Sequence, residues 1–341
     1  MATLRSDIIV PEVFTPYIIE ETTRRDAFLQ SGVVAPMAEL NATEGGDFVK
    51  VPAFAANLAG DFEVLTDSSS LTPGKITTNQ QTAVILHRGR AFESRDLAAL
   101  AAGSDPMAAI GQKLASYIAH QRQKDLISTL TGVFGSLNAN TSSSAFFELC
   151  IDSESGDTPT ALSARQISQA RAILGDQGDK LSVLCMHSKV YYDLYERNAI
   201  QYVSTDDARG TSTTQSGGDV SGQFGNPSVP TYMGCRVIVS DDVQTAGSGS
   251  STEYATYAFT PGAVASGEQT GLDIEQDRDI LAKSDAMSLD AHYVYHPVGA
   301  KYGSSTVNPT RTVLETASNW SKVFETKNVG IVRITNVSNQ D

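Results

Sequence analysis

The residues best suited to chemistry are two histidines, His292 and His296, near the end of an alternating stretch. They stand four residues apart, and the stretch runs into Pro297. On a strand, residues with this spacing share a face but lie roughly 13 Å from each other, which is too far for one metal ion. We therefore interpret both histidines as structural side chains.

A run of alternating carboxylates precedes the histidines. It consists of Asp273, Glu275, Asp277 and Asp279. A strand would place all four on one face, where they could bind a divalent cation between copies of the chain. A solvated face, or a face that pairs with arginines of a neighbour, explains the same pattern, and we favour that interpretation.

The remaining reactive side chains do not form a recognisable catalytic pattern. The sequence contains no GxGxxG, GxxxxGK[ST], HExxH or GxSxG motif. Cys150, Cys185 and Cys235 are isolated and form no CxxC pair, which is typical of free thiols in a reducing compartment. Asp241 and Asp242 fit a turn better than a catalytic pair. We therefore predict that the protein is not an enzyme and has no catalytic, cofactor-binding or metal site.

Composition narrows the class of protein further. Of the 341 residues, 40% are hydrophobic and 19% are charged. This is enough to form a hydrophobic core, either in two or three domains or in one large domain whose parts interlock. The formal charge of −14 argues against a groove that grips nucleic acid. The chain begins without the apolar core of a signal peptide and has no run long enough to span a membrane. These features predict folding in the cytosol.

The strongest helix signal covers Asp105 to Thr131. Asp105 can cap the helix, Pro106 suits its first position, and apolar residues recur with helical spacing, as at Ile110, Leu114 and Ile118. At 1.5 Å per residue, this helix would be roughly 40 Å long. We expect Gly132 to end it.

A ribbon of two strands precedes this helix. The first strand alternates around Val49 and Val51, and Pro52 favours an edge position. The second is predicted from Lys75 to Arg90, with a turn-rich stretch between the two. Because a two-stranded ribbon is only marginally stable in water, it should bind to something outside itself. A long surface loop is the alternative.

The rest of the chain alternates between helices, strands and loops. Ser31-Gly32 should end a helix that starts at Tyr17, and Ser188 should cap a helix that follows a buried strand. The segment 205–228 is polar and rich in glycine, which predicts a projecting loop. Strands are predicted at 181–187, 234–243, 254–259, 273–280, 287–295 and 330–337.

Four stretches carry a family resemblance. They are IVPEVFTPYIIEE…FLQSGVV (Ile9 to Val34), LSVLCMHSKVYYDL (Leu181 to Leu194), VPTYMGCRVIVSDDV (Val229 to Val243) and IEQDRDILAKSDAMSLDAHYVYHPVGAKY (Ile274 to Tyr302). Each is weak alone. In this order, with the ribbon and the long helix between them, they resemble the major capsid proteins of tailed bacteriophages, which have the Hong Kong 97-type shell fold.

The resemblance implies an α+β fold with five parts. These are an N-terminal arm (1–40), an extended loop (41–95), a peripheral domain with the spine helix (96–155), an axial domain (156–270), and return strands of the peripheral domain with a C-terminal segment (271–341).

The resemblance also implies a function. Such proteins form pentamers and hexamers of an icosahedral phage head around double-stranded DNA, which they do not bind by sequence. The implied partners are copies of the chain, neighbouring capsomers, a portal and, in some members, a decoration protein. The implied location is the virion, after assembly in the bacterial cytoplasm. The candidate contacts between subunits are Phe62, Leu65, Leu71 and Lys75 on the extended loop and Asp206, Asp207 and Arg209 on the axial loop.

Two departures from family features shape further expectations. Some members carry a cleaved N-terminal scaffolding segment; here the arm begins almost at Met1, which favours a separate scaffolding protein. Some members crosslink their subunits through a loop lysine. Lys50 and Lys75 lie in the ribbon, but no partner residues can be identified, so we expect no crosslinking. A ladder of multimers on a denaturing gel of mature particles would contradict this expectation.

Two alternatives remain open from the sequence. An encapsulin, a cellular nanocompartment with the same fold, would copurify with a cargo enzyme, whereas a phage shell would package DNA. The long ribbon and the glycine-rich loop favour the phage. A monomeric α/β enzyme would instead show a pocket with convergent polar groups and a monomeric mass in solution.

Overall fold

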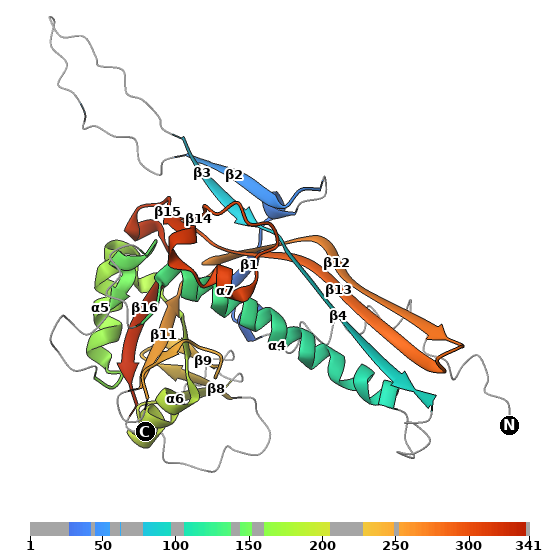
Figure 1. The fold of residues 1–341 in the computed structure, drawn as a ribbon. Helices are drawn as coiled ribbons and strands as arrows, with labels where there is room; N and C mark the ends of the chain where they lie inside the picture. The colour runs from blue at the N-terminus through green and yellow to red at the C-terminus, as the bar shows by residue number, and fades with distance from the viewer. Residues whose placement is uncertain are drawn as a thin grey trace, which may run out of the picture.

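The structure is a computed structural model of the chain. It describes residues 27–41, 45–54, 62, 78–96, 106–137, 144–151, 160–204, 228–248 and 252–338. Figure 1 shows three parts: a long sheet beside a long helix, a projecting two-stranded ribbon, and a body of mixed sheet and helices.

The long helix is α4 (Pro106–Phe134), with 29 residues. It begins at the proline that the sequence pattern placed first, but it does not end at Gly132. The helix continues through Gly132. A Cβ at this position would lie 1.8 Å from the carbonyl oxygen of Leu314, so the close approach of the chain there requires a glycine. Gly135, with φ of +78°, follows the last turn. Gly132 therefore serves close packing, and the expected stop was wrong by three residues, since Gly135 and not Gly132 follows the helix.

Helix α4 lies along a sheet of four strands within the described residues. These are β1 (Val34–Pro36), β4 (Leu86–Arg95), β12 (Val264–Asp279) and β13 (Ser284–Pro297), in the order β1-β12-β13-β4. The predicted strands at 273–280 and 287–295 are parts of β12 and β13, which form one long antiparallel hairpin. The ring of Phe92 on β4 meets that of Tyr117 on α4, with centroids 5.8 Å apart. Figure 1 shows the hairpin and β4 running alongside the helix.

The predicted second strand of the ribbon is divided between two sheets. Strand β3 (Thr78–Val84) pairs with β2 (Phe48–Phe54), whereas β4 pairs with β13. The break falls at Ile85, whose backbone N–H donates to the carbonyl of Asp47 at 3.0 Å. Ile85 is fully buried, so the chain changes sheet where an apolar side chain enters the core. One continuous strand was expected because the sequence pattern runs through this point.

The body is built on a sheet of eight strands, again counting described residues. Its order is β5-β16-β11-β6-β9-β8-β7, with β10 paired to β11. The strands are β5 (Cys150–Ile151), β6 (Val183–Met186), β7 (Gln201–Ser204), β8 (Ser228–Tyr232), β9 (Cys235–Val239), β10 (Thr245–Ala246), β11 (Glu253–Phe259) and β16 (Ile331–Val337). The C-terminal strand β16 thus joins this sheet beside β11.

The body also contains two helices, α5 and α6. Helix α5 (Ala164–Leu174) starts with a capping box between Ser163 and Gln166. Helix α6 (Ser188–Glu196) starts at Ser188, but its cap is His187, whose Nδ1 accepts from the backbone N–H of Lys189 at 3.2 Å. The expected Ser188 cap was therefore wrong by one residue.

Short elements complete the described chain. Helix α2 (Ala27–Gln30) ends where the sequence predicted, before Gly32 with φ of +76°. The others are α7 (Arg311–Leu314), the pair β14 (Ala300–Tyr302) and β15 (Trp320–Lys322), and the 3-10 helices Ala38–Leu40, Phe147–Leu149, Gly175–Lys180, Ala317–Asn319 and Thr326–Asn328.

One large apolar cluster joins the two sheets through α4, and a small second cluster lies at the base of the ribbon. No disulfide joins the three cysteines; Cys185 and Cys235 are buried and Cys150 is partly exposed. No helix in the described ranges combines the length and apolarity that a membrane span requires.

Candidate functional site

A buried carboxylate, Asp125 in the middle of α4, holds three parts of the chain together. Its Oδ2 accepts from Tyr293 on β13 at 2.5 Å and from Arg88 on β4 at 3.3 Å. Its Oδ1 accepts from Arg311 on α7 at 2.6 Å. Burial, together with Asp125, raises the pKa of the Tyr293 hydroxyl, so this group stays a donor. The cluster fixes the long sheet and the C-terminal segment to α4. These three parts form a rigid frame, from which the ribbon and the hairpin tip project.

The ribbon is tied firmly at its base. Gln81 on β3 accepts the backbone N–H of Gly299 at 3.1 Å, and Asn79 donates to the carbonyl of Val323 at 3.3 Å. Phe48 on β2 stacks on Tyr302, with ring centroids 6.2 Å apart. Away from this base, Phe62 is fully exposed. The ribbon is therefore a projection with a fixed root.

The tip of the β12–β13 hairpin is a second projection, at the end of the long sheet away from the ribbon (Figure 1). Arg278 bridges Asp285 and Asp96, with N–O distances of 2.8 Å to each. Asp279 accepts the backbone N–H groups of Leu281 and Ala282 at 2.8 and 3.0 Å, and these bonds lower its pKa. This ordered turn presents Ile280 and Leu281, which are 79% and 96% exposed.

Exposed apolar side chains on a rigid turn are typical of contact surfaces, because a neighbour can bury them without first ordering them. The sequence reasoning missed this tip. The sequence did contain a signal for it, because the apolar pair Ile280-Leu281 follows the turn-forming Asp279. In the structure the turn ends at Lys283, which adopts φ of +49°.

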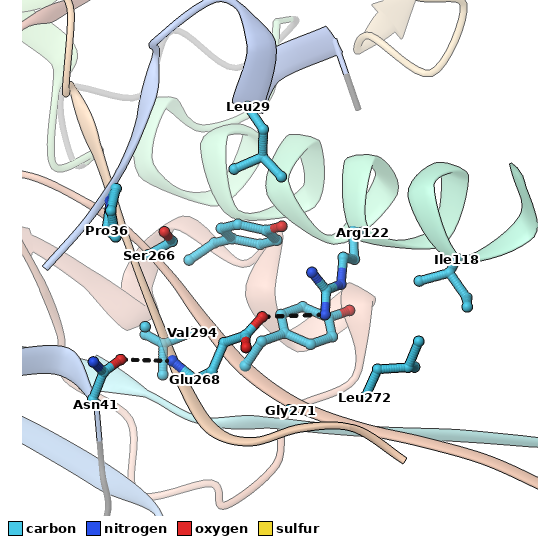
Figure 2. A pocket seen from close by; sticks show the side chains of 13 residues that line it. Leu29, Pro36, Asn41, Ile118, Arg122, Ser266, Glu268, Gly271, Leu272 and Val294 are labelled. Carbon is cyan, nitrogen blue, oxygen red and sulfur yellow. Dashed lines mark hydrogen bonds and ion pairs between the residues drawn. The ribbon is translucent and has the colours of Figure 1, made fainter. Parts of the chain in front are cut away.

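A cavity of about 480 Å³ lies between the α2–β1 segment, α4 and β12 (Figure 2). Arg122 donates to Glu268 at 3.4 Å and lies over the ring of Tyr293, 5.2 Å from its centroid. The side-chain oxygen of Asn41 accepts the backbone N–H of Glu268 at 3.0 Å. Among the described residues that line the cavity, Glu268 is the one carboxylate, and it forms an ion pair with Arg122. At this cavity, the ion pair between Arg122 and Glu268 therefore links α4 to β12.

The histidines that the sequence singled out occupy different environments. His292 lies against His87, with ring centroids 4.3 Å apart. His296 is buried, and burial lowers its pKa to about 4 while the backbone of Ala300 opposes the shift. Across the described ranges, no three His, Cys, Asp or Glu side chains are arranged to hold a metal ion.

The alternating carboxylates share one exposed side of β12, as their spacing predicted. They are Asp273, Glu275, Asp277 and Asp279. Asp241 and Asp242 lie in a turn, also as predicted. Asp242 connects this turn to α4, with 3.3 Å to His120 and 3.6 Å to Lys124.

Of the predicted contact residues, Phe62 is described and exposed. The others lie outside the described residues: Leu65, Leu71, Lys75, Asp206, Asp207 and Arg209. The sequence reasoning also missed Asp125. Its signal was a carboxylate beside Leu126 and Ile127, inside the apolar pattern of the helix.

Together, the long helix under a hairpin sheet, the projecting ribbon and the α/β body define the Hong Kong 97-type capsid fold. Solved phage capsids share it. The capsid of cyanophage Pam1 has a TM-score of 0.58 at 14% identity, with 94% of each chain covered. The capsid of Ralstonia phage GP4 has a TM-score of 0.58 at 9% identity, with 93% of this chain and 91% of that chain covered.

The family follows from sequence similarity. The model of the Gp13-like family, major capsid protein 13-like, matches residues 35–330, and the chain belongs to this family. It is 35% identical over 338 residues to the major capsid protein of Bacillus phage SPP1, with 96% of each chain covered. The chain is thus a major capsid protein of a tailed phage, as the resemblance implied. These relatives are capsid proteins, so they support neither the encapsulin nor the enzyme alternative.

Proposed function

We propose that the chain assembles into pentamers and hexamers that tile an icosahedral head around double-stranded DNA. The observation that carries this proposal is the pair of projections, the ribbon and the hairpin tip, mounted at opposite ends of one rigid frame. A subunit with contact surfaces far apart can join several neighbours at once, and repetition of weak contacts makes a closed shell stable.

The ribbon is the first proposed contact. Its strands β2 and β3 pair only with each other among the described residues, so the ribbon does not continue into a larger sheet there. Phe62 exposes a whole aromatic ring, which a neighbouring subunit could bury. We propose that Leu65, Leu71 and Lys75 belong to the same contact, in which the extended loop (41–95) lies across the next subunit.

The hairpin tip is the second proposed contact, through Ile280 and Leu281. Its apolar pair is flanked by the Arg278 cluster, so the surface has an apolar centre and a charged rim, as protein interfaces often do.

We propose a third contact at the loop 205–228, where Asp206, Asp207 and Arg209 would form ion pairs between subunits around the capsomer centre. The division into arm, extended loop, peripheral domain, axial domain and return strands also remains a proposal.

Assembly into a phage head would give the chain further partners. We propose a separate scaffolding protein, a portal, a decoration protein and packaged DNA held without sequence-specific binding. The net charge of −14 supports the last point, because an acidic wall does not retain the polyanion. Assembly in the host cytoplasm and the absence of an enzymatic activity belong to the same proposal.

Negative-stain electron microscopy tests the function directly. The purified protein would be imaged with and without a coexpressed scaffolding protein. Icosahedral shells, rings or tubes are expected, and the particle diameter would bound the number of subunits. Small monodisperse particles under every condition would contradict the proposal.

Two experiments test the role of the ribbon. Deletion of residues 61–72 should leave a soluble subunit with an unchanged unfolding temperature, but should block or misdirect assembly. Hydrogen exchange should show residues 45–90 more protected in the shell than in the free subunit, because a neighbouring subunit covers the ribbon there. Equal protection in both states would overturn this role.

A further inference from the structure

Two imidazole rings meet at the root of the ribbon. His87 on β4 and His292 on β13 are direct cross-strand partners, and their rings are tilted by 50° with centroids 4.3 Å apart. Both side chains are half-buried. The Nε2 atom of His87 is buried and has no hydrogen-bond partner among the described residues. The pair is therefore partly shielded from water, and one of its ring nitrogens is unsatisfied within the described part of the chain.

The pair stands where the chain passes from the ribbon to the long sheet. His87 follows the break at Ile85 by two residues, so β3 and the ribbon begin immediately before it. Its backbone N–H donates to the side-chain oxygen of Asn308 at 3.1 Å. Any change in the packing of these rings acts on the point from which the ribbon projects.

The charges around the pair have opposite effects. Burial lowers the pKa of His87, and His292 and Arg88 lower it further, whereas Asp47 raises it. Asp47 comes directly before β2, at the first strand of the ribbon. On β13, Asp290 lies two residues from His292, opposite Gly89 on β4. On β12, the residue opposite His292 is Thr270, which carries no charge.

We propose that the His87–His292 pair is a protonation switch that sets how the ribbon is held against the long sheet. With both rings neutral, they pack together and close the β4–β13 pairing beside the ribbon. When His87 gains a proton, His292 and Arg88 disfavour the charge and Asp47 attracts it.

The two protonation states therefore have different contacts, which a switch requires. The neutral state favours the contact between β4 and β13. The charged state favours an ion pair between His87 and Asp47. His87 then interacts with a residue at the root of the ribbon instead of with His292 on the long sheet. Acidification should loosen the cross-strand pair and change the angle of the ribbon.

The first test is a titration of the free subunit with carbon-13-labelled histidine, followed by NMR. Variants His87→Gln and His292→Gln assign the two signals. We expect His87 to titrate below the ordinary range of a histidine, and we expect His292→Gln to raise the midpoint of His87, because the neighbouring imidazole no longer disfavours its protonation. Independent titration of the two rings would overturn the proposal.

The second test is hydrogen exchange of the free subunit at about pH 7.5 and about pH 5, corrected for the intrinsic rates. Residues 78–96 and 284–297 should exchange several-fold faster at the acidic pH. The double variant His87→Gln, His292→Gln should lose this response, and His87→Lys should show the acidic pattern already at the higher pH.

The matched control is His120→Gln, which removes a half-exposed histidine that contacts Asp242 on another part of the chain. It should keep the full acid response. An unchanged exchange pattern in the wild-type subunit, or a response that survives in the double variant, would contradict the switch. Because both tests use the free subunit, their failure is separable from a failure of shell assembly.

Discussion

Arg311 donates through Nε to the Oδ1 atom of Asp125 at 2.6 Å, and this contact joins the C-terminal segment to the middle of α4. Asp125 is fully buried, and it also accepts from Arg88 and Tyr293. A buried carboxylate with three donors from three distant parts of the chain is well compensated, so its removal should be costly.

We predict that Asp125→Asn lowers the free energy of unfolding by about 3 kcal/mol, because two arginines lose their counter-charge in a poorly hydrated site. Chemical denaturation of the free subunit measures the effect. Asp273→Asn, on the exposed side of β12, is the matched control and should change stability by less than about 0.5 kcal/mol. Equal effects of the two substitutions would show that the buried cluster contributes little.

Gly132→Ala should also destabilise the subunit, although alanine normally favours helices. The added Cβ would lie 1.8 Å from the carbonyl oxygen of Leu314, so α4 and α7 would have to separate. We expect a loss of about 2 kcal/mol, measured by denaturation. The control is Gly303→Ala, where the nearest atom lies 3.7 Å from the new Cβ. A stabilising effect of Gly132→Ala would contradict this close approach.

The hairpin tip should separate assembly from stability. We predict that replacing Ile280 and Leu281 together by serine leaves the unfolding temperature of the free subunit unchanged, because both side chains are exposed. The yield of shells, counted by electron microscopy after gradient sedimentation, should fall sharply. Val307→Ser, at a site that is 48% exposed elsewhere on the surface, provides the control. Normal shell yield in the tip variant would remove the tip from the proposed contacts.

His296 should make stability depend on pH. Burial lowers its folded-state pKa to about 4, whereas the unfolded value is about 6.5. The unfolded chain therefore binds the proton first on acidification. The contribution is complete above about pH 6.5 and is lost as the pH falls toward about 4, by up to about 3 kcal/mol.

Urea denaturation across this pH range measures the effect. His296→Leu should flatten the slope of stability against pH relative to wild type, whereas His120→Gln should not, since His120 is half-exposed. An unchanged slope in His296→Leu would show that this imidazole is charged or hydrated in the folded chain.

The local sequence pattern was sufficient to predict many of the helices and strands. The start of α4 at Pro106, the end of α2 at Gln30 and the core strands β6, β9, β11 and β16 were all predicted, because hydrophobic periodicity and capping residues act over a few positions. The family resemblance rested on the order of these elements along nearly the whole chain.

Tertiary structure decided the remaining features. No local signal separates β3 from β4 at Ile85, because the division depends on which sheet each half meets. Gly132 matches a helix stop in sequence, and only the approach of Leu314 explains why a glycine occupies this position inside the helix. The partners of Asp125 come from positions 88, 293 and 311, and His87 meets His292 across more than half of the chain. Such contacts form between residues that are distant in sequence, so periodicity and spacing could not reveal them.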